Sequence, residues 1–471
     1  MPRFRAARSR CTPFLSALLC IAGCAHYTPK PLEPAKSLQA LQARRLDDPA
    51  VLERLRALNI SEPSDDKHWG RTQLLIAALH LNPKIAEARA VLAQSVAAGT
   101  TARELENPAV SLSSEYDLTR AAESPWLWGL ATSFLTDTFA SRGVRIDLAA
   151  TQTRAARADF EEALWTVRKD LRSALLALEI DTRRVALLEE DVRTREQLHR
   201  LADARVQAGA SPRAETLQSE LELSRSRAAL DDARSQLADG RSRLAGALGV
   251  PAAALTGLEL QFEELDAPPP IESDRFSALR EQALLARADL AKAIADYDAR
   301  ELDLKQQMGA RYLQFSAGPG YVYDHGIRKL TLGASVLLPV FNQNQGPIAE
   351  AFAARESAGR HAEAVQAAVF TEIDAARQAY DAALSALIRA RAQRQTSESL
   401  ARAARRALEL DATDRPSVLA AESSANTDRI VELDALDRAQ QALGALEDAL
   451  RTPLSGPERG LVLQNLTTAD H

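Results

Sequence analysis

The sequence predicts a mainly α-helical fold with a small β part, in which one structural unit occurs twice. Two very long segments carry the spacing of long helices that pack side by side. A pair of segments with alternating apolar and polar residues precedes each of them. The whole order recurs 202 to 205 residues later, a period too long for a solenoid, so a complete structural unit is duplicated.

The N-terminus has the pattern of a bacterial export signal. Four arginines between residues 3 and 10 precede a short apolar run at residues 14–21, and the small residues Ala22 and Gly23 stand before Cys24. The segment from Ile21 to Cys24 resembles a lipobox, which implies cleavage of residues 1–23 and acylation of the Cys24 thiol. Ala25, in place of an aspartate, favours delivery to the outer membrane. The alternative is an ordinary signal peptide with an incidental cysteine.

The duplication is visible at several separate points. The segment Asn82–Ala88 resembles Arg287–Ala293, 205 residues later, and Leu217 corresponds to Leu419 at a separation of 202. Residues 268–270 are three consecutive prolines between the two copies, which suits a linker. The sequence therefore divides as follows: an N-terminal extension at 24–66, a first repeat at 67–265, a second repeat at 266–455 and a polar tail at 456–471.

The strand pairs are expected at about 108–135 and 311–339. Aromatic and aliphatic residues alternate there with small and polar ones, so each strand has two unlike faces. The apolar positions are Val110, Leu112, Tyr116, Leu118, Trp126, Trp128, Leu130, Phe134, Leu313, Phe315, Tyr321, Tyr323, Leu330, Leu332, Val336 and Leu338. Such faces fit a transmembrane barrel or one half of a soluble sandwich. Four strands alone cannot close a barrel or cover their edges.

The long helices are expected from about Val144 to Ala208 and from about Pro347 to Leu410. Apolar residues from Phe160 to Val192 follow a heptad-like spacing that Asp181 interrupts, and this spacing requires a partner helix. At 1.5 Å per residue the first helix reaches ~95 Å. Turns at about 208–215 and 411–417 then return the chain into a second helix.

Composition and motifs argue against several functions. The net charge is −6, which opposes nucleic-acid binding through phosphate neutralisation. The three cysteines all precede residue 25, and the seven histidines lack the HExxH or HxxxH spacing of a zinc site. With no nucleophile elbow or phosphate loop either, the sequence predicts no enzyme, no cofactor and no metal.

Taken together, these features resemble the outer-membrane efflux proteins, the TolC-like channels, in a lipoprotein form. The motifs that carry the resemblance lie at 69–90, 124–130, 209–217, 333–342 and 345–346, and the similarity covers roughly residues 67–455. The resemblance implies a homotrimer in which each chain gives four strands to one twelve-stranded transmembrane β-barrel. The long helices would continue it as an α-barrel through the periplasm.

The resemblance also implies a function and its partners. Such a trimer is a passive exit duct in the outer membrane, lipid-anchored here, which docks a periplasmic adaptor and an inner-membrane pump of an efflux or secretion system. The alternative is a periplasmic coiled-coil adaptor or scaffold lipoprotein with a soluble β module. Metal ions, drugs and polypeptides all remain open as the transported substrate.

The two turns are the expected periplasmic tips. Residues expected to contact the adaptor are Gly209, Ala210, Ser211, Arg213, Thr413, Arg415 and Pro416. Some members of the family place acids near this tip that constrict the pore, and the matching acids here are Glu215, Asp411, Asp414 and Glu422. The alternative is that these acids are solvated charges in the first turn of a helix. The second tip lacks the glycine that is usual in the family.

Overall fold

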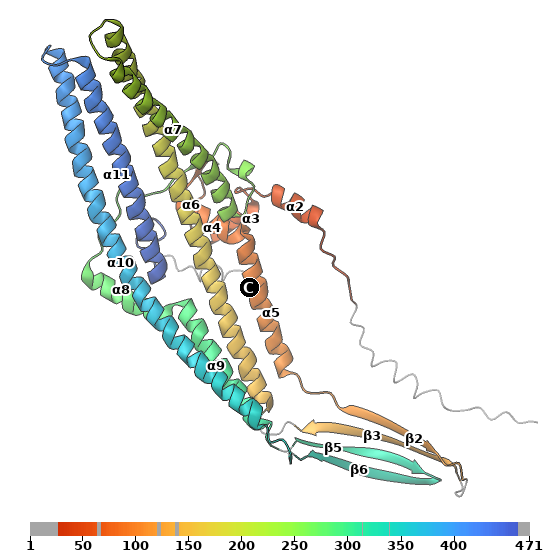
Figure 1. Cartoon of the computed structure of the whole chain (residues 1–471). Coiled ribbons are helices and arrows are strands. Elements are labelled where there is room, and N and C mark those ends of the chain that lie inside the picture. The colour runs from red at the N-terminus through yellow and green to blue at the C-terminus, as the bar shows by residue number, and fades with distance from the viewer. Residues whose placement is uncertain are drawn as a thin grey trace, which may run out of the picture. The chain divides into compact units, whose positions relative to one another are not determined.

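The computed structural model describes residues 27–63, 67–119, 124–136, 141–312, 314–338 and 340–459 (Figure 1). The chain divides into two compact units, Met1–Ala43 and Arg44–His471. The described part of the first unit holds one short helix, α2 (Pro34–Gln42). Every other described element belongs to the second unit.

The second unit repeats one order of elements, as the sequence predicts. After α3 (Pro49–Ala57) and β1 (His68–Trp69), the first copy comprises α4 (Arg71–Leu81), α5 (Pro83–Arg103), β2 (Ala109–Tyr116), β3 (Trp126–Thr136), α6 (Ser141–Gln207) and α7 (Arg213–Leu248). A 3₁₀ turn (Ala252–Leu255) and β4 (Glu259–Leu260), which pairs with β1, connect the copies. The second copy comprises α8 (Ser273–Ala286), α9 (Ala288–Gly309), β5 (Gln314–Asp324), β6 (Ile327–Leu337), α10 (Gln345–Glu409) and α11 (Arg415–Leu450).

Equivalent helices begin at equivalent residues. Asn82 is the N-cap of α5 and Arg287 is the N-cap of α9, 205 residues later. The Asn82 side chain accepts a hydrogen bond from the backbone N–H of Lys84 at 2.9 Å, which satisfies a free donor of the helix end. Pro83 at the first helical position has no N–H to leave unpaired.

The strand pairs of both copies join into one sheet. Its order is β2–β3–β5–β6, and all neighbours are antiparallel. The central pairing crosses the copies, with Trp128 opposite Tyr323 and Leu130 opposite Tyr321. Strands β2 and β6 are the two edges, so four strands leave both edges unpaired within the described chain.

The long helices form two hairpins, α6 with α7 and α10 with α11, and α6 packs against helices of both copies. Near the sheet, the contacts follow the order α5–α6–α9–α10, and toward the turns they follow α7–α6–α11–α10 (Figure 1). The apolar stripe of α6 is buried, with Leu164, Val167 and Leu171 in the main core and Leu188 and Val192 in a smaller cluster with α7. The predicted heptad seam is therefore confirmed.

The linker and the second half of the extension are both held on this core. The Tyr380 hydroxyl of α10 donates to the Pro269 carbonyl at 2.6 Å, which fixes the triple-proline segment. Leu46, Val51 and Leu55 lie in the main core, and Arg44 donates to the carbonyls of Leu81 and Gly249. Residues 44–58 are thus part of the folded core.

Candidate functional site

The sheet has two chemically different faces. The strand register places the predicted apolar series of all four strands on one side, which we call the apolar face. Its described members include Val110, Leu112, Tyr116, Trp126, Trp128, Leu130, Phe134, Phe315, Tyr321, Tyr323, Leu330, Leu332 and Val336. The other side carries Ser111, Ser113, Gly129, Ala131, Ser133, Ser316, Gly318, Gly320, Thr331, Gly333 and Ser335, and we call it the small polar face.

The apolar face is open to the surroundings. Leu112, Leu330 and Leu332 expose 76%, 86% and 82% of their surface. The described buried clusters contain no residue of these four strands. The sheet is therefore not one half of a sandwich within the described chain, and apolar surface of this extent requires an apolar neighbour.

Aromatic rings gather at one end of the apolar face, where β2 leads to β3 and β5 to β6. This end of the sheet lies far from the helices (Figure 1). Tyr116 and Trp126 meet edge to face at 4.8 Å between centroids. Trp128 lies 5.6 Å from Tyr321 and 5.9 Å from Tyr323. Tryptophan and tyrosine combine an apolar ring with a polar group, which is why they concentrate where a bilayer meets water.

The two tips are built from the same turn. In the first, the N–H of Gly209 donates to Val206 O and that of Ala210 donates to Arg205 O. In the second, Asp411 and Ala412 donate in the same way, to Leu408 O and Ala407 O. Gly209 has φ of 72° and Asp411 has φ of 51°. Aspartate tolerates this left-handed conformation, which explains how the second tip forms without a glycine.

The predicted adaptor-contact residues all lie at these turns. Gly209, Ala210, Arg213 and Arg415 are exposed, whereas Ser211, Thr413 and Pro416 are half-buried. Arg415 donates to the Gln197 side chain of α6 at 3.4 Å, which links the second tip to the first repeat.

The predicted gate acids have different surroundings. Glu215 forms an ion pair with Arg205 at 3.3 Å, and Glu422 pairs with Arg405 in the equivalent hairpin. Asp414 is the N-cap of α11, and hydrogen bonds from the Ser417 hydroxyl and N–H hold the pKa of its carboxyl below the ordinary value. Asp411 is exposed in the turn itself. Glu215 and Glu422 therefore brace their own hairpins, and Asp414 starts a helix.

A buried ionic cluster joins the two repeats, and the sequence pattern did not reveal it. We define it by Arg71 of α4, Arg168 and Arg172 of α6, Glu447 of α11 and Glu458. Each of these side chains is at most 4% exposed. Glu458 accepts from Arg71 Nε and from Arg168 Nε, both at 2.8 Å. Glu447 accepts from Arg168 at 2.8 Å and from the N–H groups of Leu454 and Ser455.

The charges of this cluster support one another. Burial lowers the pKa of Arg168, but the carboxylates of Glu458 and Glu447 outweigh burial and raise it above the ordinary value. Burial raises the pKa of Glu447, but Arg168 and Arg172 outweigh burial and hold it below the ordinary value. Burial, with Arg71 and Arg168 nearby, lowers the pKa of Arg172 to about 10 despite Glu447. Arg168, Arg172 and Glu447 are thus charged at neutral pH.

A signal for this cluster exists in the helix pattern. Arg168 follows Leu164 by four residues, and Glu447 follows Leu443 by four, so both charged residues stand at positions that face the core. Charged residues are almost never buried unless they are paired. Two such positions on different helices point to a buried ion pair between those helices.

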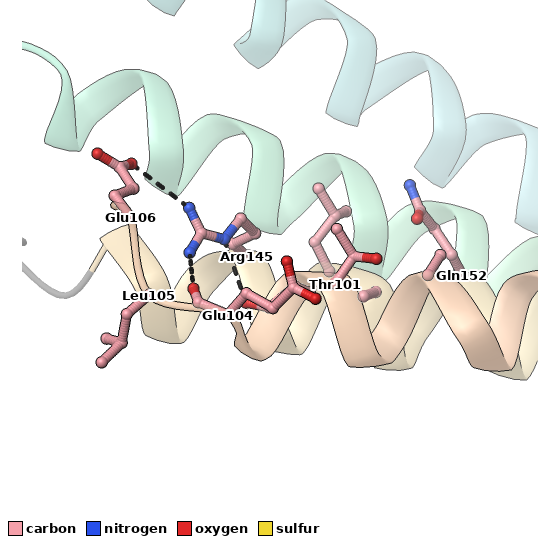
Figure 2. A pocket seen from close by; sticks show the side chains of 10 residues that line it. Thr101, Glu104, Leu105, Glu106, Arg145 and Gln152 are labelled. Atoms are coloured by element: carbon pink, nitrogen blue, oxygen red, sulfur yellow. Dashed lines mark hydrogen bonds and ion pairs between the residues drawn. The ribbon is translucent and has the colours of Figure 1, made fainter. Parts of the chain in front are cut away.

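An open pocket lies where the helices give way to the sheet (Figure 2). Arg145 of α6 reaches across it, donating to the carbonyls of Ala102 and Glu104 and lying 3.8 Å from the Glu106 carboxylate. These bonds satisfy carbonyls at the C-terminal end of α5, so Arg145 holds a helix end in place.

The described residues contain no group of three or more histidine, cysteine or acidic side chains placed to hold a metal ion. Within the same residues, no helix is both long and apolar enough to cross a membrane. The predicted lipidation residue Cys24 lies outside the described residues, and so do Leu313 of the apolar series and most of the predicted tail beyond residue 459.

Comparisons with known proteins agree with this architecture. Residues 74–250 match the family model described as outer membrane efflux protein. No curated protein matches the sequence significantly.

Solved structures share the fold at low sequence identity. The outer membrane protein VceC from Vibrio cholerae is 18% identical with a TM-score of 0.66, over 81% of this chain and 95% of that one. The open state of the Neisseria gonorrhoeae MtrE outer membrane channel is 16% identical with a TM-score of 0.66, over 81% and 88%. A membrane protein from Pseudomonas aeruginosa is 21% identical with a TM-score of 0.65, over 81% and 92%.

The predicted fold class, helical with a small sheet part and a duplicated unit, is confirmed. The predicted resemblance to the outer membrane efflux proteins is confirmed as well, by the match to that family over residues 74–250 and by the fold of TolC-like channels, whereas the lipoprotein form stays a prediction.

Proposed function

We propose that the chain is the outer-membrane exit duct of a tripartite efflux or secretion system and that it works as a homotrimer. The observation that carries the proposal is the combination of two unlike faces and two open edges in one four-stranded sheet. A sheet of this kind is complete only when its edges are paired and its apolar face meets lipid.

The strand number sets how copies join. Because β2 and β6 are separated by an odd number of antiparallel steps, they run in opposite directions. Strand β6 of one copy therefore pairs with β2 of the next in the same antiparallel pattern, and three copies give twelve strands. Lipid then covers the apolar face, and the small polar face lines the passage.

The helices support the same arrangement. Among the four helices near the sheet, α5 lies at one side and α10 at the other. In the chain, α5 directly precedes the edge strand β2, and α10 directly follows the edge strand β6. Rotation about one axis thus closes sheet and helices together. The 67 residues of α6 extend to ~100 Å, a length suited to a tube that crosses the periplasm.

The partners follow from the two ends of this tube. The tips that hold Gly209, Ser211, Thr413 and Arg415 contact a periplasmic adaptor, which links the duct to an inner-membrane pump. The pump supplies the energy, and the duct performs no chemistry. Glu215, Asp411, Asp414 and Glu422 gather negative charge around the tip opening and restrict flow there. Acylated Cys24 adds a lipid anchor to the outer membrane.

The alternative of a periplasmic adaptor or scaffold is less well supported. A soluble β module would bury its apolar face, yet Leu330 and Leu332 are more than four-fifths exposed. In addition, β3 of the first copy pairs with β5 of the second. The two strand pairs therefore form one continuous sheet, and not two separate modules.

Heat-modifiable migration tests the proposal. Outer membranes are solubilised in mild detergent and run on a denaturing gel with and without boiling. We expect a trimer band without boiling and a monomer band after boiling, and extraction that requires detergent. A protein that washes off with salt or carbonate and runs as a monomer without boiling contradicts the duct.

A further inference from the structure

One charged side chain interrupts the apolar face. Arg328 lies on β6 directly opposite Tyr323 of β5, so both side chains belong to the apolar face. Across the described residues of the four strands, Arg328 is the charged member of that face, since Glu115, Asp324 and Lys329 alternate onto the small polar face. A charged guanidinium on an apolar face is unfavourable unless a partner compensates its charge.

The surroundings of Arg328 form an aromatic box. A hollow of about 540 Å³ is lined by Ser124, Trp126, Trp128, Tyr321, Tyr323 and Arg328. Its wall contains ring faces, one indole N–H on each tryptophan and the tyrosine hydroxyls. The box is therefore apolar along its sides and rich in hydrogen-bond donors.

Arg328 has no anion of its own in this box. Within the described chain, none of the ion pairs or hydrogen bonds involves its guanidinium, and the side chain is exposed. The neighbouring Lys329 differs, because its ammonium lies 2.5 Å from Asp324 on the opposite face. Asp324 therefore compensates the charge of Lys329, whereas no ion pair within the described chain compensates that of Arg328.

We propose that Arg328 and the aromatic box bind the phosphate headgroup of an anionic membrane lipid. The inference rests on the proposed function, because it requires the apolar face to meet lipid. A guanidinium presents paired N–H donors that match two phosphate oxygens. The rings of Trp126, Trp128, Tyr321 and Tyr323 lie where apolar chain and polar headgroup meet. The lipid phosphate supplies the negative charge that the described side chains of the apolar face lack.

Lipid-selective quenching of tryptophan fluorescence tests the proposal. The chain has four tryptophans, and Trp69 and Trp165 are buried in the helical core, so Trp126 and Trp128 report on the box. The full-length trimer is placed in phosphatidylcholine vesicles that contain a fixed small fraction of either dibrominated phosphatidylglycerol or dibrominated phosphatidylcholine. Bromine quenches indole emission only at close range.

We expect phosphatidylglycerol to be enriched at the box about two- to five-fold, as a basic residue near a charged membrane produces. Arg328→Gln should remove this preference. Lys329→Gln is the matched control, since it removes the same charge from the next residue on the opposite face, and it should retain the preference. Heat-modifiable migration verifies that each variant has assembled.

The outcomes separate this inference from the proposed function. Equal quenching by both brominated lipids in the wild type, or equal loss of preference in both variants, overturns the lipid site and leaves the duct intact. Absence of quenching by either lipid shows that the face does not meet a bilayer, and it overturns both proposals.

Discussion

Arg168 and Glu458 form an ion pair at 2.8 Å in which the two side chains are 1% and 2% exposed. Arg168 belongs to the first repeat, and Glu458 follows the last helix of the second. Their contact thus links the first copy to the end of the second copy, across a sequence separation of 290 residues. A buried carboxylate in this position is tolerated because Arg71 and Arg168 both donate to it.

Removing the charge of Glu458 should destabilise the protein strongly. In Glu458→Gln, Arg71 and Arg168 lose an anionic acceptor but stay buried, and breaking a buried pair on one side costs about 3–5 kcal/mol. We expect a clear fall in the thermal unfolding temperature of the detergent-solubilised protein. Asp159→Asn is the control, because its 2.7 Å ion pair with Lys292 is about half exposed and should contribute less than about 1 kcal/mol. Equal losses in the two variants contradict this account.

The cluster also predicts how stability depends on pH. The folded-state pKa of Glu447 lies below its ordinary value of 4.5. Its contribution is therefore complete above that value and is lost as pH falls through the folded pKa. Burial raises the pKa of the neighbouring Asp448 carboxyl, although the charge of Arg168 opposes this. The contribution of Asp448 to stability therefore depends on pH in the opposite direction. It is present at low pH and is lost as pH rises.

Thermal unfolding measured between about pH 6 and pH 3 checks this dependence. We expect the wild type to lose stability on the acid side, and Glu447→Gln to show a flatter acid limb, because the variant has no carboxyl to protonate there. The variant is less stable throughout, so the slope rather than the midpoint is the readout. An unchanged slope in Glu447→Gln assigns the acid sensitivity to other groups.

Local pattern was sufficient to predict most of the fold. The first long helix runs over Ser141–Gln207, against a prediction of about 144–208, and the second over Gln345–Glu409, against about 347–410. The strand faces followed from alternation alone, since a period of two depends on neighbouring residues. Cap and turn residues such as Asn82 and Gly209 act within a few positions of themselves.

The local pattern does not predict which segments pair when they are far apart in the sequence. The joining of β3 to β5 depends on how the two copies pack, and the burial of Glu458 depends on two helices distant in sequence, α4 and α6. The pattern of residues 456–471 predicts a polar tail, but Gly456 and Glu458 at its start are buried. Polarity predicts exposure unless a partner is known, and here the partners lie nearly 300 and 400 residues away.

Asp181 offers a test in which removing a charge stabilises the protein. It interrupts the apolar stripe of α6, is 8% exposed, and burial raises the pKa of its carboxyl despite Arg184 and Arg243 nearby. Its charged form is therefore unfavourable at neutral pH. We expect Asp181→Asn to raise stability by about 1 kcal/mol at pH 7, with the gain vanishing below about pH 4, where both side chains are neutral.

Asp191→Asn is the matched control for that test. It lies ten residues further along α6 and is 5% exposed, but it accepts hydrogen bonds from Arg195 and Ser226 at 2.7 Å. Its replacement should lower the unfolding temperature, because it weakens charge-assisted bonds. Variants that shift stability in the same direction contradict the distinction between an unpaired and a paired buried carboxylate.

The tip acids can be tested without breaking the helices that they support. Asparagine caps a helix about as well as aspartate, so Asp414→Asn removes charge and retains the acceptor for Ser417. Combined with Glu422→Gln, it lowers the negative charge of the second tip of each protomer, while the turn at Asp411 is kept. If these acids restrict the opening, single-channel conductance in a planar bilayer should rise, by roughly two-fold for a ring of charges at a narrow passage.

Asp239→Asn is the control for this test. It replaces an exposed acid on α7 remote from the turn, and it should leave conductance unchanged. A double variant that conducts like the wild type would mean that Asp414 serves only as a helix cap and Glu422 only as the partner of Arg405.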